Sequence, residues 1–138
     1  MIKRFLVSIT PESSLFNELS MTAIRVFVGL SMAFSHGIGK IPPSEGFIAK
    51  VGELGFPEPM IFAWAAALSE FAGGLMLASG LLTRVGAFFV AFTMITAAFG
   101  VHAADPFGKQ EMSLLYLMIS LVFLVRGSSR LSVDRFLN

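Results

Sequence analysis

Residues 59–82 of the chain read PMIFAWAAALSEFAGGLMLASGLL, and they contain one ionisable side chain, Glu70. A helix needs roughly 20 consecutive apolar residues to cross a bilayer, so this stretch is long enough to span a membrane. Pro59 suits the first turn of such a helix, because its missing N–H would be unpaired there in any case. The stretch therefore predicts a transmembrane helix that carries a carboxyl group near its middle.

Three further apolar stretches accompany the first, at residues 17–35, 83–101 and 109–125. They lack the alternation of apolar and polar residues that barrel strands show, so we predict helices. Between the first two spans, apolar residues recur at helical spacing, at Phe47, Ile48, Val51 and Leu54. This spacing predicts a short amphipathic helix lying on the membrane surface. The expected fold is all-α: a four-helix transmembrane bundle with an interfacial helix between helices 1 and 2, forming one domain over residues 1–138.

The composition excludes several classes of protein. The chain has 138 residues, of which 55% are hydrophobic and 14% are charged, whereas a soluble domain averages about 25% charged residues. A formal net charge of +1 provides no basic face for phosphates, so a nucleic-acid partner is not expected. The sequence has no cysteine, which excludes disulfides, thiol catalysis and iron–sulfur ligation. Any redox role therefore needs a bound cofactor or a partner protein.

The distribution of lysine and arginine predicts how the chain is oriented. On the predicted topology, one side of the membrane holds Lys3, Arg4, Arg84, Arg126, Arg130 and Arg135. The other side holds Lys40, Lys50 and Lys109 among several acidic residues. The positive-inside rule then places both termini in the cytoplasm. Residues 5–9 are too few for the core of a signal peptide, so we expect residues 1–20 to be a cytoplasmic tail.

Two ionisable residues are predicted at similar depth inside the membrane. At 1.5 Å of rise per residue, Arg25 lies about 16 Å from His36 along the first span, and Glu70 lies about 16 Å from Pro59 along the second. An unpaired charge at such a depth costs about 3 kcal/mol. We therefore expect Arg25 and Glu70 to face each other as a candidate intramembrane polar site. The alternative is a purely structural ion pair that fixes the helix register.

Four further polar residues gather at the outer ends of the predicted spans: His36, Lys40, His102 and Glu111. They form a candidate outer-mouth proton or ligand site, since buried imidazole and carboxylate groups exchange protons near neutral pH. Together with the deeper pair they outline a polar shaft from the surface to the middle of the membrane. The alternative is that each is an ordinary boundary residue, such as an interfacial anchor at Lys40. No cluster of ligands accompanies the two histidines, so no metal site is predicted.

Several motifs stand in a fixed order along the chain. They are Arg25-x-x-x-Gly29, His36-Gly37-x-x-Lys40, Leu54-Gly-Phe-Pro-Glu-Pro59, Glu70-x-x-Gly73-Gly74, Gly80-Leu-x-Thr83-Arg84, His102, and Gly127-Ser-Ser-Arg130-Leu-Ser132-Val-Asp134-Arg135. The ordered set resembles the DoxX family of small bacterial four-helix membrane proteins, over residues 22–135. The resemblance implies location in a bacterial inner membrane and association with quinone-linked oxidoreductases. It transfers no settled catalytic role to any of the matching polar residues.

Three hypotheses for the function follow from the resemblance and the polar residues. In the first, the protein is a quinone-interacting or accessory subunit of a membrane redox complex, with the Arg25 and Glu70 pair as its deep site. In the second, it is a non-enzymatic scaffold for a partner complex, and the amphipathic helix and the basic tail carry the specificity. In the third, it handles a small solute or a lipid, although no inverted repeat is evident. Whether it catalyses a reaction, and whether it forms a homo-oligomer, stays open.

Overall fold

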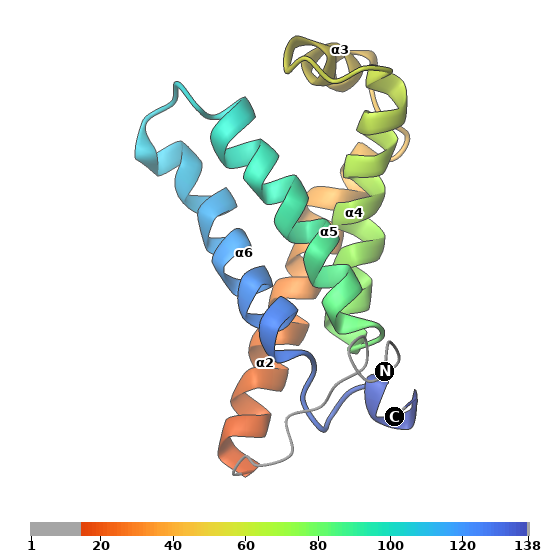
Figure 1. The fold of residues 1–138 in the computed structure, drawn as a ribbon, viewed down its shortest axis with the longest axis vertical. Helices are drawn as coiled ribbons and strands as arrows, with labels where there is room; N and C mark the ends of the chain where they lie inside the picture. Colours follow the sequence, from red (N-terminus) through yellow and green to blue (C-terminus); the bar gives the residue numbers. More distant parts are fainter. Residues whose placement is uncertain (1–14, 138) are drawn as a thin grey trace.

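The computed structural model describes residues 15–137, which form helices joined by turns (Figure 1). Four helical segments are long and apolar enough to cross a membrane: Leu15–Lys40, Pro59–Ser79, Thr83–Val101 and Phe107–Arg126. The prediction of an all-α bundle with four spans is therefore confirmed. The basic residues Lys3 and Arg4, which supported the predicted orientation, lie outside the described residues.

The first span is longer than the sequence predicted. Helix α2 (Leu15–Ser31) continues through a π-helical turn, η1 (Met32–Gly37), and a 3-10 turn, η2 (Ile38–Lys40). The prediction ended this span at residue 35, but the π-helical turn lets the chain continue through His36 and Gly37 without a break. Such turns occur frequently at functional sites, and this one carries Lys40 to the second span.

The other spans follow closely on one another. Helix α4 (Pro59–Ser79) ends before the predicted residue 82 because Gly80 adopts a left-handed conformation, with φ 71°, and closes the helix. Helix α5 (Thr83–Thr96) begins at once and continues through a second π-helical turn, η3 (Ala97–Val101). Helix α6 (Phe107–Arg126) follows after a short turn and completes the bundle.

The spans pack in the order in which they occur in the chain. Helix α4 packs on α2 and on α5, and α5 also packs on α6, whereas α2 and α6 make little contact. Figure 1 shows that α4 and α5 are joined by a hairpin at one end of the molecule and diverge toward the other end, where α3 lies. The bundle is therefore tightly packed at the hairpin end and opens toward α3.

Glycine lets the first two spans touch through their backbones. A Cβ atom added at Gly29 would lie 2.5 Å from the backbone nitrogen of Ala78, and one added at Gly74 would lie 2.8 Å from that of Ala33. Any larger residue would force α2 and α4 apart. Close contact through small residues is typical of membrane helices, because lipid chains are as apolar as the helices and leave packing to drive association.

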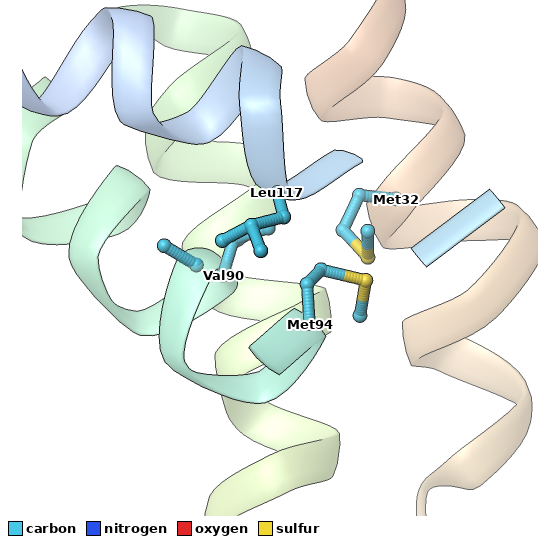
Figure 2. Close-up of a cluster of buried hydrophobic side chains, with 5 residues drawn as sticks. Met32, Val90, Met94 and Leu117 are labelled. Carbon is cyan, nitrogen blue, oxygen red and sulfur yellow. The ribbon is translucent and has the colours of Figure 1, made fainter. Parts of the chain in front are cut away.

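An apolar core lies where the π-helical turn η1 of the first span, α5 and α6 meet. Figure 2 shows Met32 of the first span facing Met94, with Val90 and Leu117 beside them, and all of these side chains are buried. Many large apolar side chains also lie on the outside of the bundle. Exposed apolar area on this scale marks contact with a membrane or a partner rather than with water.

Helix α3 (Glu45–Glu53) lies in the connection between the first two spans, as predicted. Ser44 caps it, because its hydroxyl accepts a hydrogen bond from the Phe47 N–H at 3.2 Å. Its position on the membrane surface stays a prediction. Phe47 and Val51 of α3, with Leu54 directly after it, line a cavity against α4 and α5, so α3 covers one end of that cavity.

The C-terminal segment folds back under the hairpin between α4 and α5. We call residues 127–137 the C-terminal clasp; it ends in the short helix α7 (Asp134–Leu137). The buried Asp134 carboxylate accepts hydrogen bonds from the backbone N–H groups of Leu82 and Thr83 and from the Thr83 hydroxyl, at 2.7 to 3.1 Å. The clasp thus satisfies donors at the start of α5 that have no partner within that helix.

Candidate functional site

Arg25 lies inside the bundle and is 1% exposed. Its guanidinium donates hydrogen bonds to the carbonyl oxygens of Leu77 and Ala78, at 2.8 and 2.6 Å, and to that of Leu131, at 2.7 Å. The last carbonyls of a helix have no N–H group four residues further along the helix to bond to, so the Leu77 and Ala78 oxygens at the end of α4 can accept from a side chain. Arg25 therefore ties α2 to the end of α4 and to the C-terminal clasp.

The predicted pairing of Arg25 with Glu70 is wrong. Glu70 lies seven residues before Leu77 on α4, which is about 10 Å along the helix axis. Counting residues along each span placed the two charges at similar depth, but it could not show that backbone carbonyls would satisfy Arg25. The two members of the candidate intramembrane site are therefore in separate places, and Glu70 has a different partner.

That partner is Lys40, at the end of the first span. The Lys40 ammonium lies 2.7 and 2.6 Å from the two carboxylate oxygens of Glu70. The side chain of Glu70 is 3% exposed and that of Lys40 is 35% exposed. The Lys40 ammonium also lies 5.6 Å from the ring centroid of Phe47, within the range of a cation–π contact. A buried carboxylate thus has a charged partner that a ligand can reach.

This ion pair lies in the wall of a cavity of about 410 Å³ between α4 and α5. Most of the wall is apolar, and its aromatic part consists of Phe47, Phe56, Phe62, Phe89 and Phe92. Ligand pockets usually measure about 300 to 1,000 Å³ and combine an apolar lining with a few polar groups. The cavity has both properties, so it is a candidate ligand site.

The structure divides the four residues that were predicted to form one outer mouth. Lys40 and His102 both line the cavity. His36 instead packs edge-on against Tyr116 of α6, with 5.4 Å between the ring centroids, and Glu111 is exposed on α6 and does not line the cavity. The four residues therefore do not form a single polar shaft with Arg25, and only two of them share a site with Glu70.

His102 is held in place by the turn that follows it. Its Nδ1 atom lies 2.7 Å from Asp105 Oδ2, and the Gln110 amide donates to the carbonyl oxygens of His102 and Asp105, at 2.7 and 3.3 Å. The hydrogen bond with His102 is the main cause that lowers the pKa of Asp105 below its ordinary value, and Lys109, 3.6 Å away, acts in the same direction. With Nδ1 engaged, Nε2 is the ring nitrogen that remains for a ligand.

Sequence reasoning did not identify Asp105 or the phenylalanines as parts of the site. The spacing His102-x-x-Asp105 was a usable signal, because residues three apart in a helical turn can touch. The phenylalanines gave no such signal, since they come from α3, α4, α5 and the loops between them. Within residues 15–137, no group of three or more histidine, aspartate or glutamate side chains is placed to hold a metal ion.

Comparison with known proteins identifies the family to which this chain belongs. The family model for DoxX matches residues 20–103. The protein named "Putative oxidoreductase CatD" of Bacillus subtilis (strain 168) is 34% identical over 120 residues, which cover 86% of this chain and 87% of that protein. "Inner membrane protein YqjF" of Escherichia coli (strain K12) is 37% identical over 110 residues, which cover 74% and 80% of the two chains. No solved structure matches. This chain, a membrane protein with four spanning helices, belongs to the DoxX family.

Proposed function

We propose that this protein binds a quinone in the cavity between α4 and α5 and serves as a membrane subunit of a redox assembly. The observation that supports this most directly is the Lys40–Glu70 ion pair in the wall of a cavity that is otherwise mainly apolar and aromatic. A quinone combines the same two characters. Its ring carries carbonyl oxygens that accept hydrogen bonds, and the rest of the molecule is apolar.

The ion pair supplies the chemistry that a quinone headgroup needs. The Lys40 ammonium has three donor protons, and here it bonds to both oxygens of one carboxylate. By releasing one of these oxygens, it can donate to a quinone carbonyl instead. A quinone takes up protons with its electrons; the Lys40 ammonium within hydrogen-bond reach can deliver one, and the Glu70 carboxylate can accept a replacement proton and pass it on. Phenylalanine rings in the wall provide surfaces on which the quinone ring packs.

His102 connects the proposed site to water. It lines the same cavity and lies just beyond the end of the third span. Imidazole exchanges protons close to neutral pH, so His102 is suited to replenish protons that the headgroup consumes. Asp105 keeps the ring oriented by occupying Nδ1. In this proposal the Lys40–Glu70 pair is the deep proton donor, with the proton on the Lys40 ammonium, and His102 is the group at the mouth.

Electrons reach the quinone from another protein in this proposal. The sequence has no cysteine for iron–sulfur ligation, and its spans use most of the 138 residues, so we assign electron supply to a partner that carries a reduced cofactor. This makes the chain an accessory subunit. The relative named as a putative oxidoreductase, CatD, supports a redox setting. The relative named as an inner membrane protein, YqjF, supports a bacterial inner membrane, and the basic side that holds Arg84 and Arg126 would face the cytoplasm.

Extraction of bound quinone tests the proposal. Wild-type protein would be purified in mild detergent beside Glu70→Gln and a matched control, Glu58→Gln, which changes an exposed carboxylate outside the cavity. We expect quinone in stoichiometric amount, by solvent extraction and mass spectrometry, in the wild type and in Glu58→Gln. We expect its loss from Glu70→Gln that is still folded. A folded wild type that carries no quinone and takes up none in nanodiscs would refute the proposal.

A scaffold role is the second candidate, and the exposure of α6 favours it. Only 22% of the α6 span is buried inside the protein, against 33 to 39% of the other spans. Its outward face carries large side chains that include Met112, Leu115 and Val122. Such a face can pack against a helix of a partner complex. In that case a Leu115→Asn substitution, and not Glu70→Gln, would remove the co-purifying partner.

A further inference from the structure

We infer that the quinone enters the cavity sideways from the bilayer, between α4 and α5, and that its polyisoprenoid tail lies in this opening. This inference rests on the function proposed above and adds the route and the class of quinone. The lateral opening is the gap that is bordered by Ala65, Ala66 and Ser69 on α4 and by Phe89 and Phe92 on α5, all of which line the cavity.

Among residues 15–137, no helix covers the outer side of the cavity. Its lining residues come from α3, α4, α5, their turns and the end of the first span, and none belongs to α6 or to α2 over Leu15–Ser31. Phe89 and Phe92 line the cavity and are also 46% and 54% exposed. The same two side chains therefore belong both to the cavity wall and to the outer surface of the bundle.

The opening lies at a depth where the surroundings are lipid. Glu70, at the inner end of the cavity, is about 16 Å along α4 from Pro59 at the helix start, and the hydrocarbon core of a bilayer is about 30 Å thick. Phe89 and Phe92 lie in the middle of α5, within the third span. A molecule that leaves the cavity through this gap therefore meets acyl chains, while α3 covers the end toward the loops.

The two rims of the opening differ in size. The α4 rim consists of small residues, Ala65, Ala66 and Ser69, while the α5 rim carries two phenylalanine rings. Helices α4 and α5 diverge toward α3 (Figure 1), and the small side chains of the α4 rim border the cavity of about 410 Å³ that a flexible chain would enter. Since lipid is as apolar as the opening, a tail gains little energy by lying there. Its role is to keep the ligand in the bilayer while the headgroup binds inside.

The depth of the ion pair favours a quinone over a phospholipid as the occupant. Lys40 and Glu70 together carry no net charge. Glu70 lies about 16 Å along α4 from the start of the helix at Pro59. A phosphate headgroup would have to bring its charge to this depth, at a cost of several kcal/mol. A quinone headgroup is uncharged, so it can reach the pair while its tail stays among the acyl chains.

A bulky residue in the opening tests this inference. We would compare wild type, Ala65→Trp and a matched control, Ala72→Trp, which changes another exposed alanine of α4 that does not line the cavity. Binding would be measured in nanodiscs for a dimethoxybenzoquinone and a methylnaphthoquinone, each with and without a polyisoprenoid tail. A bulky side chain that overfills a packed site commonly weakens binding about tenfold. We therefore expect the tailed compounds to bind about tenfold more weakly to Ala65→Trp. We expect the tailless compounds to bind as they do to wild type, and Ala72→Trp to bind all of them like wild type. Equal losses for tailed and tailless compounds, or no loss, would overturn the inference.

Tryptophan fluorescence gives a second test that does not depend on quinone. The chain has a single tryptophan, Trp64, so the double variant Trp64→Phe with Ala65→Trp places the only indole in the opening. We expect acyl-brominated phospholipids to quench it strongly and aqueous iodide to quench it weakly. Quenching by iodide and not by the brominated lipid would place the opening in water and overturn the inference. If the wild type binds none of the quinones, the proposed function fails, and quenching still decides where the opening lies.

Discussion

The two ends of the bundle each hold a buried charge, and they hold it in different ways. At the hairpin end, Arg25 donates to three backbone carbonyls of α4 and the C-terminal clasp. At the α3 end, Glu70 has one charged partner, Lys40, whose side chain is about one-third exposed and lies beside a cavity. Arg25 is enclosed by packed protein, and Glu70 lies in the wall of the cavity.

The partners of the two charges indicate which one holds helices together and which one is available to a ligand. Backbone carbonyls at the end of a helix cannot move away without unfolding it, so the bonds of Arg25 act as a permanent tie. Lys40 is a long side chain with rotatable bonds, and it can exchange the carboxylate for another acceptor. Buried charges in membrane spans are costly and are usually functional, but in this chain the hydrogen bonds of Arg25 all go to backbone carbonyls, and only Glu70 lines the cavity. The burial of a charge does not distinguish the two cases, whereas its partners do.

Replacing Arg25 should have the largest effect on stability. Arg25→Met removes the donors for three carbonyl oxygens in a buried setting, which we expect to cost about 3 kcal/mol or more. The measurement is thermal unfolding in detergent, together with the monodisperse fraction by size-exclusion chromatography. Glu70→Gln is the comparison, and it should change the unfolding temperature much less because the amide can still accept a bond from Lys40.

The variant Arg25→Lys sharpens this comparison. A single ammonium cannot reproduce the planar fork with which a guanidinium bonds to separate carbonyls, so we expect a stability between those of wild type and Arg25→Met. If Arg25→Met unfolds at the same temperature as Glu70→Gln, the distinction between a structural and a functional charge is wrong for this protein.

Replacing Asp134, at the same end of the bundle, should lower stability by an intermediate amount. Asp134→Ala removes the acceptor for two backbone N–H groups at the start of α5, and the loss of a helix cap costs about 1 to 2 kcal/mol. We expect a lower unfolding temperature and faster proteolysis of the C-terminal clasp. Arg135→Ala, at an exposed neighbouring position, is the control and should behave like wild type. Equal proteolysis of both variants would show that Asp134 does not hold the clasp.

The overall fold could be predicted because its signals are local. The length and hydropathy of a stretch such as residues 59–82 are sufficient to identify a span, and the helical spacing of Phe47 and Val51 is sufficient to identify α3. Neither inference requires knowledge of what lies across the bundle. The boundaries that were wrong depend on single backbone conformations: the π-helical turn after Ser31 and the left-handed Gly80.

The partners of the polar side chains could not be predicted because they depend on the arrangement in space. The expectation of equal depth did not predict the partners of Arg25 and Glu70, because Arg25 bonds to α4 at Leu77 and Ala78, about 10 Å along the helix from Glu70. Nothing in the sequence marks the Leu77 and Ala78 carbonyls as acceptors, because every residue has a carbonyl. The reach of Lys40 across to α4 depends on the extra turns of the first span. The polar residues themselves were found, but their pairing was not.

The cavity was the least predictable feature of the site. It arises from the divergence of α4 and α5, with α3 covering one end, and no property of one helix encodes it. Small residues such as Ala65 and Ala66 are usual in membrane helices and serve equally for close packing. Only the combination of a small rim, a phenylalanine rim and an ion pair makes the location informative, and that combination is assembled from three parts of the chain: the end of the first span, α4 and α5.

The smallest expected effect lies at the mouth of the cavity, at Asp105. The folded protein lowers its pKa, chiefly through the hydrogen bond with His102, so the carboxylate contributes stability above the ordinary aspartate pKa of about 3.9. That contribution disappears as the pH falls through the lower pKa of the folded protein. His102→Gln removes the main cause, and we expect the pKa of Asp105 to rise toward its ordinary value. The carboxyl carbon chemical shift of Asp105, followed against pH, measures this.

Lys109 supplies the matched control for this last prediction. It contacts the other oxygen of the same carboxylate at 3.6 Å and is largely exposed, so solvent screens its charge and Lys109→Gln should raise the pKa of Asp105 less than His102→Gln does. Which of the two variants raises the pKa of Asp105 more decides whether the turn holds His102 through Asp105. If Lys109→Gln has the larger effect, Asp105 is not bound firmly to His102. The remaining nitrogen of His102 would then have no fixed direction toward the cavity, and proton exchange would have to rely on the Lys40–Glu70 pair alone.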